Sequence, residues 1–236
     1  MTADEHTPED ATWRNFYGRR HGKTLNQAQK DYLAEDLAAL SPGAVDPADN
    51  PARVPLDLAA RFGGSPVWLE IGFGGGEHLA HQAALHPDVA FIGCEPFVNA
   101  VAMLLGKIRQ RALRNIAIYP GDVRDLFDVL PDQSIARAFL LYPDPWPKTR
   151  HHRRRFVTRD HLAPLHRVLM SGAQFRVATD IPDYVRQTLA EVPAAGFRRI
   201  DGDDIHQPWD DWISTRYEQK ALREGRRPHY LTFERV

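Results

Sequence analysis

The chain has 236 residues, 43% hydrophobic and 26% charged, with a formal net charge of −1 at pH 7. This length suits one α/β domain with a full core, or one domain with a small appendage. No apolar run approaches the roughly 20 residues of a membrane-spanning helix. The N-terminus lacks a signal pattern and the single cysteine, Cys94, excludes an internal disulfide. We therefore expect a cytoplasmic protein with no membrane partner.

The charges are segregated along the chain, although they nearly cancel in the sum. Residues 1–12 contain four acids and no lysine or arginine, so we expect a disordered acidic tail. Residues 13–30 contain five basic residues before the first acid, and residues 41–55 are rich in proline, aspartate and alanine. We interpret residues 13–55 as a basic N-terminal arm with a linker, and residues 56–236 as the main domain.

From Pro66 onward, short apolar runs alternate with helical patterns. The runs predict strands at 67–71, 90–94, 115–119, 135–141, 174–178, 197–200 and 229–236. Between them, helices are expected at 77–86, 97–112 and 155–169, with another after Pro182. This order predicts a doubly wound, mostly parallel sheet of about seven strands with helices on both faces. Such sheets bind ligands beyond the carboxyl ends of their strands, so polar residues should gather there.

The first strand ends in a glycine-rich loop of the form E-x-G-x-G-x-G, formed by Glu70, Gly72, Gly74 and Gly76. Glycine allows a sharp turn and a close approach of a ligand to the backbone. Where a dinucleotide fingerprint has its third glycine, this chain has Glu77, and an acid there would repel a pyrophosphate. S-adenosylmethionine has no phosphate and carries a cationic sulfonium. The loop therefore favours S-adenosylmethionine over a nicotinamide cofactor, although a tight turn without a ligand remains an alternative.

Two further strand ends carry acids. Glu95 follows the second strand, where a carboxylate can accept hydrogen bonds from both ribose hydroxyls. Asp122 follows the third strand, where it can accept from the adenine amino group or cap the helix that begins after it. Helix capping explains either acid alone, but it is a poorer explanation of three consecutive strand ends. The combination predicts cofactor binding.

The fourth strand ends in Tyr142-Pro-Asp144-Pro-Trp146-Pro-Lys148. Two prolines flank Asp144 and restrict the backbone on both sides of it. A fixed carboxylate beside aromatic side chains suits a planar base, because the rings can stack while the carboxylate accepts from N–H groups. The alternative is a stiff, packed loop without a ligand.

A basic run follows this loop directly. Five cations within eight residues suit contacts to phosphates, which supply affinity without reading sequence. A solvated face is the alternative, but the position beside the predicted reaction centre and the second basic arm favour RNA. The residues are Lys148, Arg150, Arg153, Arg154 and Arg155.

The segment from Tyr142 to Arg155 resembles the signature of the bacterial tRNA (guanine-N7-)-methyltransferases. The resemblance extends over nearly the whole chain from about residue 13 and includes the glycine loop, Thr179-Asp180 and 214–218. It implies a Rossmann-like class I methyltransferase that modifies a guanosine in the variable loop of tRNA. Where the family usually has lysine in its Thr-Lys-Phe/Tyr-Glu motif, this chain has Arg216.

The resemblance also implies roles for individual residues. Asp144 is the catalytic candidate and also lies beside the cofactor, which Glu70, Glu95 and Asp122 bind. The substrate-binding positions are Lys148, Asp180, Thr215, Arg216, Tyr217 and Glu218.

Guanine N7 has a lone pair and no proton, so methyl transfer to it requires alignment rather than a general base. We expect no metal and no obligatory protein partner, and either a monomer or a homodimer. Two other functions stay open: a methyltransferase acting on another RNA site or another substrate, and a noncatalytic RNA-binding protein with a methyltransferase fold.

Overall fold

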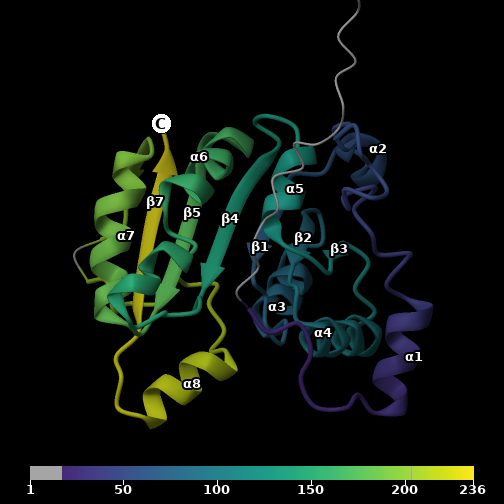
Figure 1. Cartoon of the computed structure of the whole chain (residues 1–236), viewed down its shortest axis with the longest axis horizontal. Coiled ribbons are helices and arrows are strands. Elements are labelled where there is room, and N and C mark those ends of the chain that lie inside the picture. Colours follow the sequence, from purple (N-terminus) through teal and green to yellow (C-terminus); the bar gives the residue numbers. More distant parts are fainter. Residues whose placement is uncertain (1–17, 203) are drawn as a thin grey trace, which may run out of the picture.

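The computed structural model describes residues 18–202 and 204–236. Its centre is a seven-stranded sheet with the strand order β3-β2-β1-β4-β5-β7-β6 (Figure 1). The strands β1 to β5 are parallel, whereas β7 runs antiparallel to both β5 and β6. The strands are β1 (Val67–Ile71), β2 (Ala90–Cys94), β3 (Ile116–Tyr119), β4 (Ile135–Leu141), β5 (Leu169–Thr179), β6 (Phe197–Arg199) and β7 (His229–Arg235).

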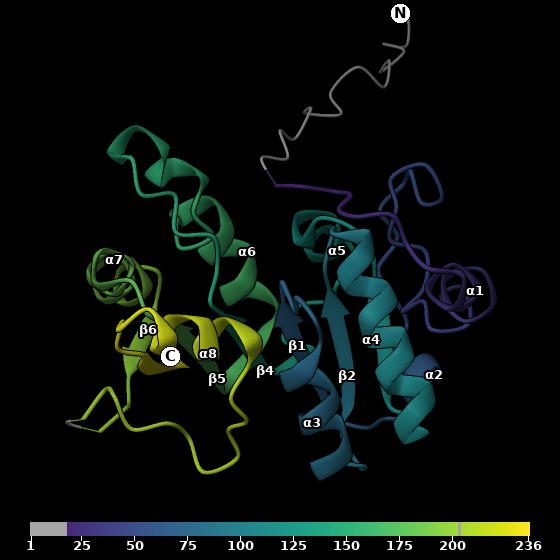
Figure 2. The same ribbon diagram turned by 90° about the horizontal axis from the view of Figure 1, so that it is seen from below.

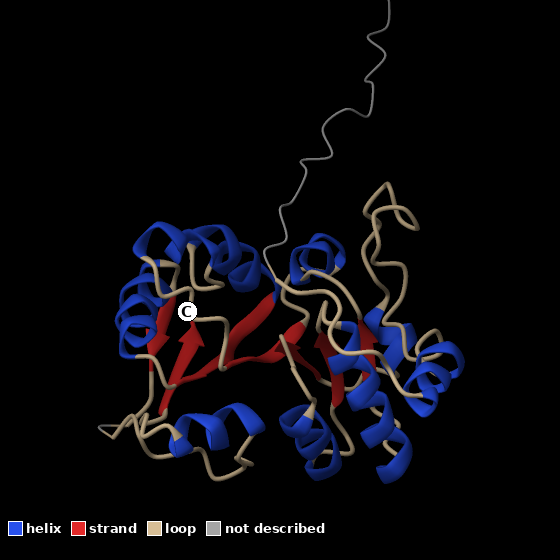
Figure 3. Ribbon diagram, turned by 60° about the horizontal axis from the view of Figure 1, so that its bottom comes forward, coloured by secondary structure: helices blue, strands red, loops and turns tan. Residues whose placement is uncertain are grey.

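Helices cover both faces of the sheet, as Figure 3 shows. Side chains of α5, α6 and α7 join the core on one face, and those of α3 and α4 form the core on the other. The helices are α1 (Gln27–Glu35), α2 (Leu58–Phe62), α3 (Glu77–Leu85), α4 (Val98–Arg111), α5 (Val123–Val129), α6 (Arg159–Val168), α7 (Pro182–Ala194) and α8 (Arg216–Arg223), with a 3-10 helix, η1 (Thr149–Arg154). The predicted α/β class, its strand number and its two covered faces are therefore confirmed.

Strand β1 illustrates why the central strands are apolar. All five of its residues are buried, because helices cover the sheet on both sides. Leu69 belongs to the core under α5, α6 and α7, while the neighbouring Trp68 belongs to the core under α3 and α4. Successive side chains of a strand point to opposite faces, so Glu70 faces α3.

The register of the sheet brings the strand ends together. Ile71 pairs with Cys94 on one side and with Leu140 on the other, and Cys94 pairs with Tyr119. The residues that follow β1, β2, β3 and β4 therefore lie along one edge. Strand order reverses between β1 and β4, and this is where a doubly wound sheet leaves a crevice for a ligand.

Several boundaries differ from the sequence prediction. The helix expected over 155–169 begins only at Arg159, because Arg155 is extended and Thr158 is the N-cap residue. Strand β5 begins at Leu169 rather than at 174. The sequence analysis also missed α1, α2 and α8, which are short or rich in polar residues.

The N-terminal segment lies against the main domain where it is described. Helix α1 packs beside α4 (Figures 1 and 2), with Tyr32 under the guanidinium of Arg109 at 4.8 Å. Further along, the Ile118 amide of β3 donates to the Leu40 carbonyl at 2.8 Å, and Val45 is buried in the core. The expected acidic tail lies outside the described residues, and the domain division at 55/56 stays a prediction.

Candidate active site

A cavity of about 740 Å³ opens at the carboxyl ends of β1 to β4. This volume lies within the range of small-molecule sites. The residues predicted for the site divide into two groups. The cavity wall contains Gly72, Gly74, Glu95, Asp122, Asp144, Arg153, Arg154 and Tyr217. Outside it lie Glu70, Gly76, Lys148, Arg150, Arg155, Asp180, Thr215, Arg216 and Glu218.

The glycine loop has the backbone that its sequence predicts. Gly72, Gly74 and Gly76 all have positive φ angles, of 69°, 52° and 72°. A Cβ on Gly74 would also lie 2.8 Å from the Tyr217 ring, and one on Gly76 would lie 2.7 Å from Leu104. The backbone therefore disfavours a side chain at all three positions, and space also excludes one at Gly74 and Gly76; Gly72 and Gly74 present bare backbone to the cavity.

Glu70 lies behind the glycine loop and not in the cavity wall. Its Oε2 is 2.7 Å from Nδ1 of His78 on α3, and both residues are only 2% exposed. The His78 ring packs in turn against Trp212, with centroids 5.3 Å apart. In this geometry Glu70 is bonded to the helix that follows the glycine loop, and its contact with a cofactor stays a prediction.

Glu95 is oriented by two backbone amides. The Phe97 N–H donates to its Oε1 at 3.0 Å, and the Gly74 N–H donates to its Oε2 at 2.9 Å. Burial raises the pKa of Glu95, and these two hydrogen bonds act in the opposite direction. The carboxylate thus links the ends of β1 and β2 while it lines the cavity.

Asp122 combines both roles that the sequence left open. It caps α5 by accepting from the Arg124 N–H at 2.9 Å, and it lines the cavity. The Arg124 guanidinium also donates to both carboxylate oxygens, at 3.0 and 2.6 Å. Burial acts to raise the pKa of Asp122, but the hydrogen bonds and charge of Arg124 outweigh it and lower that pKa.

Asp144 contrasts with Asp122. Within residues 18–202 and 204–236, no hydrogen bond or ion pair to its carboxylate is present. Burial alone raises the pKa of Asp144. The loop that carries it has left-handed backbone at Tyr142 (φ 49°) and Trp146 (φ 40°), one on each side of Pro143-Asp144-Pro145. An unpaired carboxylate with a raised pKa on a constrained loop is a feature typical of functional sites.

The basic segment divides according to exposure. Arg153 and Arg154 line the mouth of the cavity, and the Arg154 guanidinium lies 5.0 Å from the centre of the Trp146 ring. Lys148 and Arg150 are exposed nearby. Arg155, by contrast, is only 1% exposed and donates to Pro145, Asp183 and Gln187. The expectation that Arg155 contacts RNA therefore does not fit this geometry, because its donors already bond within the protein.

The N-terminus of α8 lies on the glycine loop. The Arg216 guanidinium donates to Glu77, and its Nη1 lies 3.4 Å from the sulfur of Met103 on α4. The Tyr217 ring covers Gly74 and lines the cavity. Two residues expected to bind substrate thus contact the predicted cofactor loop. Glu77 pairs with Arg216 and Lys107, so its charge is not presented to the cavity.

The other residues of this motif are engaged inside the protein. Thr215 caps α8 by accepting from the Glu218 N–H at 3.3 Å. Glu218 is 4% exposed and accepts hydrogen bonds from the Trp212 indole and the Tyr230 hydroxyl. Asp180 pairs with Arg226. In this conformation Asp180 and Glu218 are bonded within the protein beside the cavity and do not line it.

The cavity wall contains several residues that the sequence did not predict. Gly18 and Arg19 reach it from the N-terminal segment, which is tied to α4 by a 2.7 Å hydrogen bond from the Gly22 N–H to Asn99. Phe97 and Arg124 also line it. Each of these two follows a predicted acid by two residues, so their nearness in sequence to Glu95 and Asp122 could have indicated them. No comparable signal pointed to Gly18 and Arg19 as residues of the cavity wall.

The sequence of this chain is similar to a family of methyltransferases and to individual proteins of that kind. The model of a putative methyltransferase family matches residues 64–231. A tRNA (guanine-N(7)-)-methyltransferase of Jannaschia sp. is 69% identical over 224 residues, which cover 94% of each chain. Its counterpart in Ruegeria pomeroyi is 68% identical over 98% of each chain. This chain belongs to the tRNA (guanine-N(7)-)-methyltransferase family.

Solved structures show the same fold at lower sequence identity. The structure of an antibiotic-related methyltransferase has a TM-score of 0.58 at 20% identity, covering 76% of this chain and 94% of that one. A [4+2]-cyclase, SpnF, matches with a TM-score of 0.52 at 16% identity, over 88% of this chain and 96% of that one. Because a cyclase shares the fold, this likeness supports the class I methyltransferase architecture and no particular reaction.

No group of three or more His, Cys, Asp or Glu side chains in 18–202 and 204–236 is placed to hold a metal ion. None of the helices in that part of the chain is long and apolar enough to cross a membrane.

Proposed function

We propose that this protein transfers the methyl group of S-adenosylmethionine to N7 of a guanosine in the variable loop of tRNA. The observation that carries the site assignment is the carboxylate of Asp144, which lies in the cavity wall on a constrained loop and has no described partner. Family membership supports the reaction, since relatives at 69% and 68% identity are named for it.

The residues at the ends of β1 to β3 suit S-adenosylmethionine. Gly72 and Gly74 bring bare backbone to the cavity wall, and the Glu95 carboxylate is held where ribose hydroxyls can donate to it. Asp122 would accept from the adenine amino group beside its bond to Arg124. The bound cofactor supplies an electrophilic methyl group on a cationic sulfonium. The acids around the glycine loop fit the positive charge of the sulfonium, and the cofactor has no phosphate that they would repel.

Asp144 would act on the guanine. As N7 gains its new bond, positive charge develops on the base, and a fixed carboxylate nearby stabilises that charge. A carboxylate without a protein partner is also free to accept an N–H of the base, which aligns N7 for the transfer. Trp146, on the same loop, offers a ring against which a base can stack.

The basic segment would hold the RNA backbone. Lys148 and Arg150 are exposed, and Arg153 and Arg154 lie at the cavity mouth, so the four can approach phosphates around an inserted guanosine. The target base has to leave the folded tRNA to reach the cavity, which costs unstacking energy. We keep the predictions of a cytoplasmic protein, a monomer or homodimer, without an obligatory protein partner.

The decisive experiment is transfer of a tritiated methyl group to unmodified tRNA, followed by identification of the product nucleoside by mass spectrometry. We expect N7-methylguanosine, and chain cleavage after borohydride and aniline treatment maps it. A transcript that contains 7-deazaguanosine is the matched control, because it lacks N7 and should accept no methyl group. Another methylated nucleoside, or no binding of S-adenosylmethionine in calorimetry, would refute the proposal.

A further inference from the structure

We propose that Arg155 is a positioning residue: its buried guanidinium holds the loop 143–147 against α7 and thereby fixes Asp144 in the cavity. The inference rests on the proposed function only for its activity readout. Arg155 lies directly after η1 and is extended, so its side chain turns inward while the preceding arginines remain near the surface. Arg155, the last cation of the basic segment, therefore bonds to the loop 143–147 and does not contact the RNA.

The guanidinium joins the loop to the helix through three hydrogen bonds. Its Nε donates to the Pro145 carbonyl at 2.8 Å. Its Nη1 donates to Oε1 of Gln187 at 2.8 Å, and its Nη2 donates to Oδ2 of Asp183 at 2.7 Å. The planar fork of arginine provides these donors in a fixed geometry, which the single ammonium of lysine cannot reproduce.

The α7 side of this connection is itself anchored. The Gln187 amide donates to the Val157 carbonyl at 2.6 Å, and the Val157 N–H donates to the Tyr184 hydroxyl at 3.4 Å. The Tyr184 ring is fully buried and lies 5.3 Å below the guanidinium carbon. The hydrogen bond from Arg155 lowers the pKa of Asp183, so the ion pair persists at neutral pH. Arg155 therefore connects the loop to a rigid element.

The loop needs such a connection. Tyr142 and Trp146 have φ angles of 49° and 40°, a region that side chains other than glycine adopt at a cost. Strained backbone persists only where its surroundings determine it, and Pro145 has no N–H with which to bond. Asp144 lies between these two positions and has no described partner of its own. The Pro145 carbonyl bound to Arg155 is thus the nearest point at which the loop is held.

The test compares Arg155→Lys with wild type in three measurements. Single-turnover methylation at saturating tRNA should fall about 10- to 100-fold, the loss expected from a small misplacement of a reacting group. Hydrogen exchange of the peptide containing the Asp144 and Trp146 amides should become faster. The third measurement, the salt dependence of tRNA binding, adds Arg155→Gln because lysine keeps the charge; its slope should match wild type, whereas loss of a phosphate contact would reduce that slope by about 0.9.

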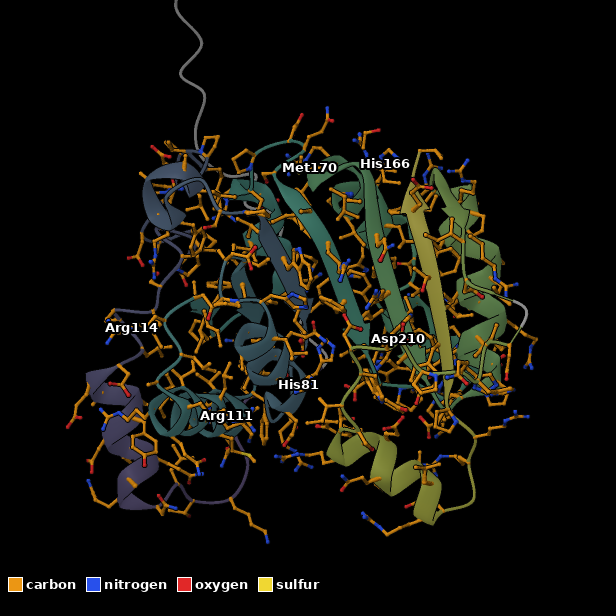
Figure 4. All side chains as sticks on the ribbon, turned by 180° about the vertical axis from the view of Figure 1, so that it is seen from behind. His81, Arg111, Arg114, His166, Met170 and Asp210 are labelled. Atoms are coloured by element: carbon orange, nitrogen blue, oxygen red, sulfur yellow. The ribbon has the colours of Figure 1, made fainter. Side chains whose placement is uncertain are left out.

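Arg167→Lys is the matched control. Arg167 also donates to two backbone carbonyls, of Phe127 and Leu130, and to a carboxylate, Asp132. Arg167 lies in the last turn of α6 next to His166, and Figure 4 shows His166 and Met170 near the end of the strands away from Asp210. We expect this variant to lose stability as Arg155→Lys does, yet to keep its turnover and the exchange rate of the Asp144 loop. Gln187→Ala, which removes one anchor, should give an intermediate loss of turnover.

Three outcomes would overturn the inference. Unchanged loop exchange in Arg155→Lys would show that the loop does not depend on the guanidinium. A reduced salt slope in Arg155→Gln would identify a phosphate contact instead. An equal loss of turnover in Arg167→Lys would identify a general effect of stability. If wild type fails to methylate tRNA, the proposed function fails, while hydrogen exchange still decides whether Arg155 holds the loop.

Discussion

The two halves of the cavity edge differ in how their acids are held. At the ends of β2 and β3, Glu95 accepts from two backbone amides, and Asp122 accepts from the backbone and guanidinium of Arg124. At the end of β4, Asp144 has no described partner and burial raises its pKa. The first half is a complete hydrogen-bonded structure before any ligand binds, whereas the second half presents a carboxylate that no described group of the protein bonds.

This difference separates recognition from reaction. A ligand that only has to be bound is served by acids whose orientation is already fixed by the protein. A group that has to respond to charge developing in a transition state is more effective when no fixed cation already neutralises it.

Asp144→Asn should have the largest effect and addresses the substrate half directly. Loss of the negative charge should lower single-turnover methylation by about 10²- to 10³-fold, a loss typical of removing one electrostatic contact to a transition state. The dissociation constant of S-adenosylmethionine should change by less than about threefold. Wild-type turnover in this variant would contradict the proposed difference between the two halves, because the unpaired carboxylate would then have no role in the reaction.

The same variant should be at least as stable as wild type at neutral pH. Burial raises the folded-state pKa of Asp144, so its stabilising contribution is present below the unfolded-state pKa and is lost as pH rises through the folded-state pKa. Asparagine does not ionise and avoids this loss. Thermal unfolding followed from acidic to neutral pH should therefore show the variant's advantage growing with pH; an advantage that shrinks would contradict the raised pKa.

Gly74→Ala should damage the cofactor half next most severely. Its φ of 52° disfavours alanine by about 1 kcal/mol, and the added Cβ would lie 2.8 Å from the Tyr217 ring. We expect S-adenosylmethionine binding in calorimetry to weaken by about tenfold or more, equivalent to about 1.4 kcal/mol. Gly63→Ala is the control, because φ is 62° there and nothing lies within 4 Å of the added carbon. It should lose similar stability and no cofactor affinity.

Lys148→Ala should have a smaller effect, confined to RNA. If Lys148 contacts a phosphate, tRNA affinity should fall and the salt slope should decrease by about 0.9, with cofactor binding unchanged. Arg198→Ala is a suitable comparison, since Arg198 is an exposed cation on the edge strand β6 and outside the cavity wall. Equal losses in the two variants would mean that the basic segment acts only through the general field of the protein.

The strands were the most predictable part of the molecule. The ranges 67–71, 90–94 and 135–141 agree with the structure, because buried parallel strands are apolar on both faces and end at glycine, proline or acidic residues. The start of α6 was not predictable in the same way. Arg155 suits a helix locally, but its buried bonds to α7 keep it extended.

The site was predictable in its position and less so in its contacts. The sequence places an acid or a glycine at each strand end, and the sheet brings these ends together. It does not reveal to which side each acid points. Glu70 faces α3 and pairs with His78, and Glu218 is enclosed by Trp212 and Tyr230. These orientations depend on pairings between distant segments that local patterns do not encode.

Arg216→Lys should have the smallest effect. It tests whether α8 contributes to the cofactor half or to the substrate half of the cavity. Lysine is the usual family residue there, and Arg216 is 42% exposed in its pair with Glu77. Exposed pairs contribute about 0.2–1 kcal/mol, so lysine should keep most of that energy and cofactor affinity should stay within about twofold. The guanidinium, however, lies against Gly75, where an added Cβ would clash with its Nη2, and a lysine would offer only a single ammonium there. A tenfold loss of cofactor affinity in calorimetry, with urea unfolding unchanged, would assign α8 to the cofactor half; an altered rate with tRNA alone would assign it to the substrate half.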